Sequence, residues 1–500
     1  MFKRILLTAF TAALAFNLSA EEAAPSVYTS HYDWQFRSVE TQDADPGENV
    51  RHQDDFTKPL HGPWLLNPST DSATIGWITR RPCAVGVEYR EKGTEEFKRV
   101  IHVKYGAVDY SKDLHAIHLT GLKPGTEYEY RLISNLGRHQ TPYSNEIFVG
   151  REIYSFRTID PEKKNYKVFL TADIHGSARL TLDPMIKNTG SENADFYFFL
   201  GDNVCGDANL RNARYYILSG FMDDVCRIWG KNKHTVVLRG NHDFRGEEMY
   251  VFGDIFARPD GETFQAFRQG STLFICLDSM WEPVTRHAEG GLQAEQIKNY
   301  LKKQADWLKE LKKSDDWKKS KFRVVFSHIG LFASESRYLQ EYFLPILNDP
   351  TPEGRIHAHI VGHEHLYNRI NPGMKEMRIA TAFAPEKPGQ YQDKMRRCPI
   401  PDNIVYTQIT GAYAECMTID VTPDKLIIKS HAWERVGGGL IDACEITPDG
   451  KVKDLVPVTV ITPAPKKQRR NEREKNNDEE IFDDPLCAFP FLRTCRSGSG

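Results

Sequence analysis

Five short polar clusters, each placed directly after an apolar run, constrain the fold of this chain more than any other feature of its sequence. In chain order they are Asp173-Ile174-His175, Gly201-Asp202-Asn203, Gly240-Asn241-His242-Asp243, Ser327-His328 and Gly362-His363-Glu364-His365. The apolar runs are typical of buried strands, and helical patterns lie between them. Because ligands bind at the carboxyl ends of the strands of an α/β sheet, we expect the clusters to meet at one rim.

The side chains of these clusters are of the kinds that hold metal ions. Carboxylate, amide and imidazole ligands without thiolate suit two divalent or trivalent ions such as Mn, Fe, Zn or Mg better than a structural zinc site. Asp202 is the candidate for a carboxylate that bridges two cations. Two ions about 3.5–4 Å apart can clamp the attacking and leaving oxygens of a displacement at phosphorus and lower the pKa of a shared water.

Taken together, the clusters resemble the calcineurin-like metallophosphoesterase superfamily, whose pattern is D-x-H, G-D, G-N-H-D/E, H and G-H-x-H. The resemblance covers roughly residues 166–430 and implies a four-layer α/β/β/α sandwich. It also implies a catalytic pair, in which His242 is the general acid and Asp243 orients it. One metal ion would be held by Asp173, His175, Asp202 and His365, and the other by Asp202, Asn241, His328 and His363.

Residues 61–157 are predicted to form an all-β sandwich, because short alternating runs recur there at a suitable spacing. The stretch from Leu119 to Tyr130 resembles the tyrosine corner of fibronectin type III domains, with Tyr128 as the corner residue. The same module precedes the catalytic domain in purple acid phosphatases. A plain spacer and a substrate-contacting role are about equally compatible with it.

Two residues depart from the purple acid phosphatases. Those enzymes have Asp-x-Gly where His175 completes the first cluster, and a tyrosine where Cys205 stands. The resemblance to that subfamily therefore extends to the order of domains, and we expect a colourless metal site. We expect Cys205 to line the pocket or to form a disulfide rather than to bind metal.

The ends of the chain differ in composition from its centre. Residues 1–20 combine a positive start, a short apolar run and small residues at the end, which is typical of a cleavable signal peptide. The run is shorter than the about 20 residues of a membrane span, so we expect export to the periplasm or the extracellular space. Five further segments are expected: a lead-in at 21–60, the sandwich at 61–157, the catalytic domain at 166–458, a disordered charged linker at 462–484 and a Cys-bearing tail at 485–500.

Within the α/β part, the patterns predict helices at about 208–229 and 292–313. They also predict strands at 404–406, 416–421 and 426–430, which we expect to complete a second sheet. His234, His357 and His359 are expected to be strand residues rather than ligands. Arg239 is predicted either to touch substrate phosphate or to make a structural ion pair. The loop from Trp281 to Gly290, with Arg286, His287 and Glu289, is predicted to line the substrate pocket.

Composition narrows the range of partners. A net charge of −3 on 500 residues, without a basic field, argues against a nucleic-acid partner. Nine cysteines are an odd number, so at least one is expected to be free or paired between chains. Cys487 and Cys495 are the best local pair, whereas Cys276 lies in an apolar run and is expected to be an inert core thiol.

The leading hypothesis is an exported phosphohydrolase with two metal ions that acts on a small-molecule phosphate ester, most simply as a phosphomonoesterase. The alternative is a phosphodiesterase of cyclic nucleotides or other diesters, because the same ligand set with Asp-x-His occurs in diesterases of this superfamily. A third hypothesis is a non-catalytic surface-binding protein, built on the β-sandwich, in which the phosphoesterase fold is a scaffold.

Overall fold

The structure is a computed structural model that describes residues 58–461, apart from 136–147, 177, 205–216, 245–249, 257, 280–291, 333–336, 381–399, 412–414 and 432–438. The expected signal peptide, the charged linker, the tail with Cys487 and Cys495, Cys205 and the loop from Trp281 to Gly290 lie outside the described residues, as does nearly all of the lead-in. Within the described part, every helix is too short or too polar to cross a membrane.

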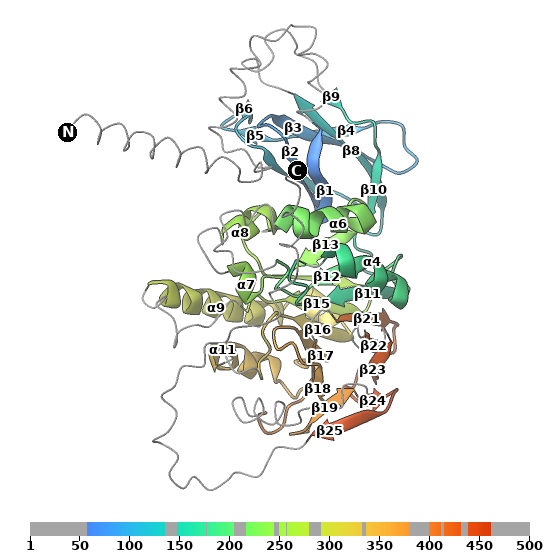
Figure 1. Cartoon of the computed structure of the whole chain (residues 1–500), viewed down its shortest axis with the longest axis vertical. Coiled ribbons are helices and arrows are strands. Elements are labelled where there is room, and N and C mark those ends of the chain that lie inside the picture. Colours follow the sequence, from blue (N-terminus) through green and yellow to red (C-terminus); the bar gives the residue numbers. More distant parts are fainter. Residues whose placement is uncertain are drawn as a thin grey trace, which may run out of the picture.

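The N-terminal part is all-β, as predicted, and lies at one end of the molecule (Figure 1). Strands β1, β2 and β7 form one face, and β10, β8, β3 and β4 form the other, with β9 beside β8. Buried side chains such as Trp77, Tyr130 and Phe156 fill the space between them. The strands are β1 (Pro59–Leu66), β2 (Ser72–Thr79), β3 (Ala84–Glu91), β4 (Lys98–Ile101), β5 (Val103–Lys104), β6 (Ala107–Val108), β7 (Leu114–Thr120), β8 (Glu127–Asn135), β9 (Phe148–Val149) and β10 (Tyr154–Arg157).

A ten-stranded sheet runs through both parts of the chain, in the order β24-β23-β22-β21-β11-β12-β13-β1-β2-β7. Strand β1 pairs in parallel with β13, where Leu65 lies opposite His234. One face of the N-terminal sandwich is therefore an extension of the central sheet. The added strands are β11 (Tyr166–Thr171), β12 (Phe196–Phe199), β13 (His234–Val237), β21 (Cys416–Val421), β22 (Leu426–His431), β23 (Leu440–Ile446) and β24 (Val452–Asp454).

The expectation that 416–421 and 426–430 complete the second sheet is wrong. Both segments are strands, but they extend the first sheet, where β21 pairs with β11 from Tyr166 opposite Val421 to Thr171 opposite Cys416. Strand β11 is buried on both faces and has β12 on one side only. Its other edge needs a partner for its backbone groups, and β21 supplies that partner.

An eight-stranded sheet faces the first, in the order β14-β15-β16-β17-β20-β18-β19-β25. Strands β15, β16, β17 and β20 are parallel neighbours. The strand predicted at 404–406 is wrong in position. Residues 404–406 precede strand β20, which begins at Thr407, opposite Ala358 of its partner β17. The strands are β14 (Gln265–Gln269), β15 (Thr272–Cys276), β16 (Phe322–Phe326), β17 (Ala358–Val361), β18 (Asn368–Ile370), β19 (Met377–Ala380), β20 (Thr407–Thr410) and β25 (Val458–Ile461).

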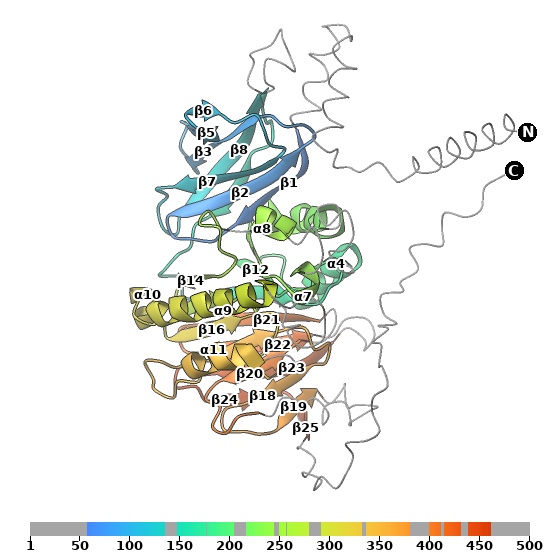
Figure 2. The same ribbon diagram turned by 90° about the vertical axis from the view of Figure 1, so that its left-hand side faces the viewer.

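The two sheets enclose a shared core, and helices pack on their outer faces (Figures 1 and 2). On the ten-stranded sheet lie α4 (Ala178–Thr189), the helical segment 218–230 and α8 (Tyr250–Phe256). On the eight-stranded sheet lie α9 (Leu292–Leu311), α10 (Asp315–Lys319) and α11 (Arg337–Leu347). Helix α9 confirms the helix predicted at 292–313, and its Ile297, Leu301 and Leu308 are buried, as the amphipathic pattern requires.

The helix predicted at 208–229 is irregular where it is described. It consists of η1 (Leu218–Met222), α6 (Asp223–Val225) and η2 (Cys226–Gly230), in which the η segments are π-helical. Trp229 stacks on Tyr197 of β12 with ring centroids 4.1 Å apart. A π turn adds a residue to the helical repeat, so it changes which side chains face the sheet.

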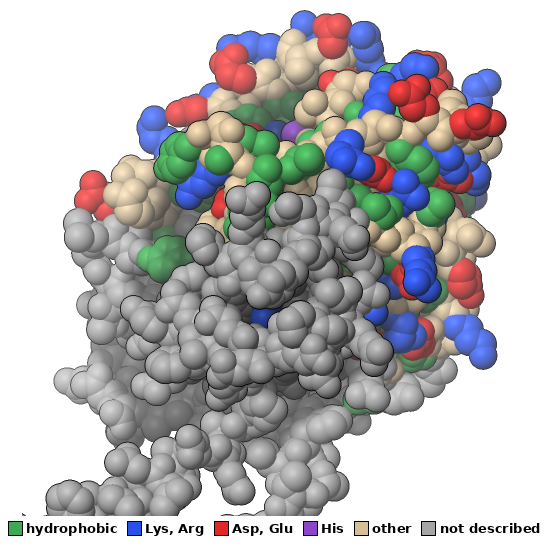
Figure 3. Space-filling model, turned by 90° about the horizontal axis from the view of Figure 1, so that it is seen from above, with side chains coloured by type: hydrophobic (Ala, Val, Ile, Leu, Met, Phe, Trp, Pro, Cys, Tyr) green, Lys and Arg blue, Asp and Glu red, His purple; other side chains and the backbone are tan. Residues whose placement is uncertain are grey.

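The five described cysteines are buried free thiols, among them Cys276, as predicted; the others are Cys83, Cys226, Cys416 and Cys444. Burial raises the pKa of Cys276 well above its ordinary value, so the thiol is inert at neutral pH. On the visible described surface at the N-terminal end, positive and negative side chains are interspersed (Figure 3).

Candidate metal centre

The five clusters lie at the carboxyl ends of strands from both sheets. Asp173, Asp202 and Asn241 follow β11, β12 and β13 of the ten-stranded sheet, whereas His328 and His363 follow β16 and β17 of the eight-stranded sheet. The candidate ligand atoms converge, since those within each of two groups lie within 4.8 Å of one another. The site therefore forms where the rims of the two facing sheets meet.

Backbone hydrogen bonds continue beyond the strand ends and hold the cluster loops against each other. The N–H of Asp173 donates to the carbonyl of Gly201 (3.1 Å), and the N–H of His175 donates to the carbonyl of Asp202 (3.0 Å). In the other sheet, the N–H of Gly362 donates to the carbonyl of His328 (2.9 Å). These bonds hold the cluster loops against each other through the backbone alone.

Several cluster residues adopt left-handed backbone conformations that non-glycine residues rarely take. Five of the eight described non-glycine residues with positive φ are candidate ligands: Asp173 (54°), His175 (43°), Asp202 (52°), His363 (71°) and His365 (52°). Each such residue costs on the order of 1–3 kcal/mol, and such strain is concentrated at functional sites. Here it turns successive side chains toward one point.

In three of the clusters, the missing side chain of a glycine leaves room for a candidate metal-ligand side chain from another cluster. A Cβ on Gly240 would lie 2.1 Å from Oδ1 of Asp202, and one on Gly201 would lie 2.5 Å from Nδ1 of His328. A Cβ on Gly362 would lie 2.5 Å from Oδ2 of Asp173. The glycines of the sequence pattern are thus explained by close approach, which an alanine at any of the three positions would prevent.

The first group of candidate ligands consists of Asp173, His175, Asp202 and His365. The Nε2 atoms of His175 and His365 lie 3.1 Å apart. Nε2 of His365 lies 3.3 Å from Oδ1 of Asp173, and Nε2 of His175 lies 3.9 Å from Oδ2 of Asp202. These are the residues that the sequence assigns to one ion.

The second group consists of Asp202, His328 and His363. Nε2 of His328 lies 3.2 Å from Oδ2 of Asp202. The amide oxygen of Asn241 joins this group, at 2.8 Å from Nδ1 of His363 and 3.1 Å from Nε2 of His328. Asp202 belongs to both groups, which is the position that a bridging carboxylate must occupy.

These distances suit ligands that share a cation. Two atoms that bind one ion at about 2.1 Å and at a right angle lie about 3.0 Å apart, close to the separation of the His175 and His365 nitrogens. The imidazole of His328 is also oriented for such a role, because its Nδ1–H donates to the carbonyl of Leu200 (2.8 Å) and leaves Nε2 to face Asp202.

The buried carboxylates make the site attractive to positive charge. Burial raises the pKa of Asp202, but neighbouring His328, His242 and His175 outweigh it, and this pKa lies well below its ordinary value. Burial lowers the pKa of His328, but the negative charge of Asp202 outweighs it and raises this pKa to about 9. A metal ion would offset the negative charge of Asp202 in place of a protonated His328, and neutral His328 would then be one of its ligands.

His242 lies at the edge of the two groups. Its Nε2 is 3.9 Å from Oδ2 of Asp202, and its side chain is 21% exposed, whereas that of His328 is fully buried. Its ring meets that of His175 edge to face, with centroids 5.0 Å apart. Its backbone N–H donates to Oδ1 of Asp202 (2.9 Å). His242 is therefore held close to both groups and is reached by solvent.

Asp243 ties two cluster turns together. Its carboxylate accepts from the N–H of Gly240 (2.9 Å) and from the N–H and side-chain amide of Asn203 (both 3.3 Å). Burial and the negative charge of Asp202 raise its pKa to about 6. Asn203 had no role assigned from the sequence, although its place directly after Asp202 is a signal that could have found it.

The residues predicted to be structural are structural. His357 and His359 lie on or beside β17; Nδ1 of His357 accepts from the N–H of Arg323 (3.1 Å), and Nε2 of His359 lies 2.8 Å from Oγ of Ser327. His234 begins β13. Arg239 forms an ion pair with Asp278 (2.7 Å), which is the structural ion pair that the sequence offered as one of two roles for this residue.

Comparisons with known proteins find one matching family model and solved structures of similar fold. Residues 166–367 match a family model described as calcineurin-like phosphoesterase. A solved structure described as "Structure of PhoD" is similar in fold: 12% identity, 80% of this chain and 92% of that chain covered, and a TM-score of 0.50. A looser likeness is to GAP50, the anchor in the inner membrane complex of Plasmodium, with 15% identity, 57% and 89% covered, and a TM-score of 0.38. No curated protein matches the chain.

Proposed function

We propose that this chain hydrolyses a small-molecule phosphate monoester with the help of two metal ions. It carries a calcineurin-like phosphoesterase domain over residues 166–367 and is a metal-dependent phosphoester hydrolase. The observation that carries this proposal is the pair of ligand groups that share Asp202. An amide and imidazole ligands complete the set without any thiolate, which suits Fe, Mn, Zn or Mg-like ions.

Each residue of the two groups has a place in this proposal. When bound, two metal ions would lower the pKa of a shared water and offset charge on the phosphoryl oxygens. One ion would be held by Asp173, His175, Asp202 and His365, and the other by Asp202, Asn241, His328 and His363.

His242 is the proposed general acid. A proton from its Nε2 would pass to the ester oxygen as the bond between phosphorus and that oxygen breaks, and water oxygen would join phosphorus. The products would be an alcohol and inorganic phosphate. Two observations support this role: the ring lies beside Asp202 at the accessible edge of the site, and its backbone is anchored to the same carboxylate. Asp243, through Gly240 and Asn203, would position the turn that carries His242.

The decisive experiment measures metal content and hydrolysis together, for the chain that starts at Glu21. The substrates are p-nitrophenyl phosphate and bis-(p-nitrophenyl) phosphate, and the proteins are wild type and Asp202→Asn. Two metals per chain and monoester turnover that the variant loses are the expected results. Turnover of the diester alone would replace the proposal by a phosphodiesterase.

A non-catalytic binding protein is the remaining alternative. His242→Ala distinguishes it on an alkyl phosphate such as glycerol phosphate, whose alkoxide leaving group needs a proton. Removal of the general acid should then lower kcat by about 100- to 10,000-fold, while the fold and metal content persist. A folded wild-type protein with neither metal nor turnover would instead favour the binding protein.

Two further proposals concern architecture and location. We infer a four-layer α/β/β/α order, supported by the helices that pack on the outer faces of the two sheets. A relation of the N-terminal sandwich to fibronectin type III domains is supported by Tyr128, whose hydroxyl accepts from the N–H of Lys123 (2.9 Å). Export rests on the character of residues 1–20; N-terminal sequencing of secreted protein should find Glu21 first, and retention of Met1 would contradict it.

A further inference from the structure

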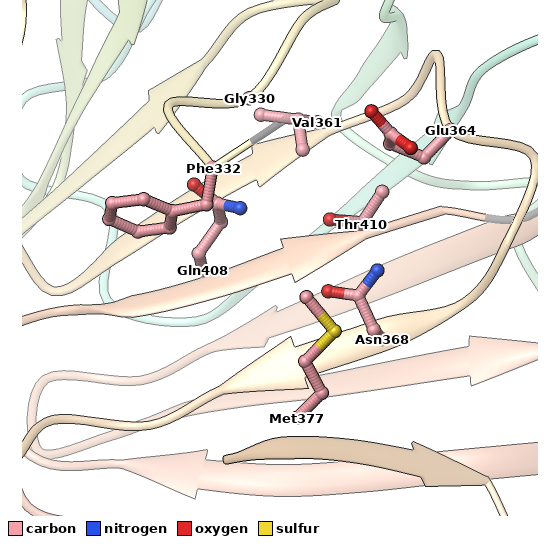
Figure 4. A pocket seen from close by; sticks show the side chains of 8 residues that line it. All are labelled: Gly330, Phe332, Val361, Glu364, Asn368, Met377, Gln408 and Thr410. Atoms are coloured by element: carbon pink, nitrogen blue, oxygen red, sulfur yellow. The ribbon is translucent and has the colours of Figure 1, made fainter. Parts of the chain in front are cut away.

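The pocket drawn in Figure 4 is too small for an organic ligand. It lies among β17, β18, β19 and β20, with Phe332, Gln408 and Met377 among its walls, and it has room for about one water molecule. The surface of the N-terminal sandwich, in contrast, presents an exposed apolar feature that is large enough to meet a partner.

That feature is the hairpin of β5 and β6, which belongs to neither sheet of the sandwich. It lies at the outer end of the sandwich, away from the phosphoesterase domain (Figures 1 and 2). Val103 lies opposite Val108, and the loop between the two strands consists of Tyr105 and Gly106 alone. A two-stranded hairpin without further partners is marginally stable in water, so its presence calls for a role.

The hairpin has one apolar side. Beyond the pair of valines, the N–H of Asp109 donates to the carbonyl of His102 (3.2 Å), so the two chains stay side by side. Nδ1 of His102 lies 4.0 Å from Oδ2 of Asp109, which places both polar side chains on one face. Because alternate residues of a strand share a face, Ile101 and Tyr110 lie on the opposite side together with the two valines.

The apolar side faces solvent. Of the ten large apolar side chains that are exposed in the described part of the chain, five lie within these ten residues. Single exposed apolar side chains are normal on a protein surface, whereas a group of them marks an interaction site. These five side chains form the apolar ribbon: Ile101 (39% exposed), Val103 (53%), Tyr105 (96%), Val108 (39%) and Tyr110 (40%).

Tyr105 is a costly residue for its place in the loop. Its φ is 54° and that of Gly106 is 77°, so both loop residues have the left-handed backbone of a type I′ turn. Asn, Asp or Gly is the usual first residue of such a turn, because a bulky side chain disfavours this conformation. The hairpin thus gives up local stability and presents an aromatic ring at its tip.

The exposed charges beside the apolar ribbon are positive. From position 97 to position 112 the only acidic side chain is Asp109, which is buried and accepts from the hydroxyl of Ser111 (2.6 Å). Lys104 and Lys112 are exposed. Two ribbons placed face to face would bring these lysines together, and like charges across an interface are unfavourable. An anionic partner therefore fits better than a second copy of the chain.

A lipid surface with anionic headgroups meets all of these features. Tyrosine rings favour the boundary between headgroups and acyl chains, and aliphatic side chains gain by entering that boundary. Lysine side chains keep their ammonium groups among the anionic headgroups. Because the ring of Tyr105 is 96% exposed, the hairpin offers a projecting tip, which suits a soft surface that it can enter.

We propose that the hairpin from Ile101 to Tyr110 docks the protein on an anionic lipid surface, with Tyr105 deepest and Lys104 and Lys112 at the headgroups. This role goes beyond the proposed hydrolysis and does not depend on it. The hairpin lies in a different part of the chain from the metal centre, so turnover of a soluble ester should be the same with and without vesicles.

Flotation with lipid vesicles tests the proposal on the chain that starts at Glu21. The vesicles are phosphatidylcholine alone or an equal mixture with phosphatidylglycerol. Wild type should float with the mixed vesicles only, and less at about 0.5 M than at about 0.05 M salt. Tyr105→Asn should lower the partition coefficient about tenfold or more, and Lys104→Glu about fivefold or more. Wild type that does not float, or Tyr105→Asn that floats as wild type does, would overturn the proposal.

Matched controls make the same changes outside the apolar ribbon. Tyr250→Asn replaces a 70% exposed tyrosine of α8, and Lys309→Glu replaces a 57% exposed lysine of α9. Both should float as wild type does, and a loss equal to that of the ribbon variants would overturn the proposal. Urea unfolding should show Tyr105→Asn to be at least as stable as wild type, because Asn suits the turn.

Light scattering distinguishes a second copy of the chain as the occupant. We expect the same mass for wild type and Tyr105→Asn. A wild-type dimer that becomes a monomer in Tyr105→Asn, without flotation of either protein, would assign the apolar ribbon to self-association and overturn the lipid proposal.

Discussion

Glycines shape the metal centre because they let ligands from different clusters approach each other. At Gly240 the nearest neighbour is Asp202, the carboxylate shared by both ligand groups. We predict that Gly240→Ala pushes Asp202 away and lowers metal content and activity together, because the clash is with a buried, hydrogen-bonded group that has no room to move. Overpacking of this kind costs about 1–3 kcal/mol. Metal analysis and turnover of p-nitrophenyl phosphate check the prediction.

The control is Gly253→Ala in α8. A Cβ there meets nothing within 4 Å, and alanine is the better helix former by about 1 kcal/mol. Metal content and activity should stay at the wild-type level. Two bound metals and full turnover in Gly240→Ala would show that the site tolerates the displacement, and would contradict our account of the glycine.

His357 makes stability depend on pH. Burial lowers its pKa from 6.5 to about 4 in the folded protein. The unfolded chain therefore binds a proton at higher pH than the folded one, so this residue's contribution is complete above about pH 6.5 and is lost as the pH falls toward 4. One pKa unit corresponds to about 1.4 kcal/mol, so about 2 kcal/mol should be lost by pH 5.

Substitution by a side chain that cannot titrate isolates this effect. Gln can both accept from the N–H of Arg323 and donate to the carbonyl of Pro448, as His357 does. Urea unfolding of wild type and His357→Gln at pH 7.5 and pH 5 should show a smaller loss of stability in the variant. Equal losses would mean that His357 is not held neutral in the fold.

At this scale the sequence predicted the ligands but not their geometry. Residue types and order were enough to identify Asp173, Asp202 and His328 as members of one site. The left-handed backbone at Asp202 and the close approach of Gly240 to the Asp202 carboxylate could not be predicted. Both depend on how loops that follow two different strands pack together.

Between elements, a buried ion pair joins the two sheets. Arg369 of β18 in the eight-stranded sheet is fully buried, and its guanidinium donates to Asp442 of β23 in the ten-stranded sheet (2.8 Å). We predict that Arg369→Met destabilises the protein by about 3–5 kcal/mol, since it leaves Asp442 buried without its cation. Chemical denaturation measures the change.

A double-mutant cycle tests the cause. Arg369→Met combined with Asp442→Leu should be less destabilised than Arg369→Met alone, because no unpaired charge then remains. The exposed pair Lys319 and Asp315 on α10 should show no measurable coupling in the same experiment. Additive effects at Arg369 and Asp442 would contradict the proposed link between the sheets.

Local sequence patterns predicted well which segments are helices and which are strands, but they did not predict which strands pair with each other. Helix α9 and the strands before each cluster were predicted because their apolar periods are strong. Strands β21 and β22 were recognised as strands and assigned to the wrong sheet. Their patterns tell which face is apolar, but the choice between the edges of β11 and β20 depends on the whole fold.

For the molecule as a whole, the ten-stranded sheet should make the N-terminal sandwich and the phosphoesterase domain unfold together. Trp64 of β1 is fully buried and belongs to the same hydrophobic cluster as Phe169 of β11 and Phe199 of β12. We predict that Trp64→Ala costs about 3–5 kcal/mol and lowers the temperature of a single calorimetric transition. Tyr105→Ala, at a 96% exposed side chain, should change stability by less than about 0.5 kcal/mol.

A calorimetric trace with two transitions, only one of which shifts in Trp64→Ala, would contradict this view. The sequence predicted the two parts and the break between them near residue 160, where composition changes. It gave no sign of their continuity, because parallel pairing between β1 and β13 joins segments with no shared local pattern.

The place of β1 in that sheet also sets an order of events for a chain that emerges with its N-terminus first. Strand β1 has β2 as a neighbour within a few residues, but its other edge must wait for β13, about 170 residues later. Until then the unpaired backbone N–H and C=O groups along one edge of β1 can pair with a wrong strand, which slows folding and favours aggregation. The protein should therefore depend on a holding chaperone during synthesis more than its compact native form suggests.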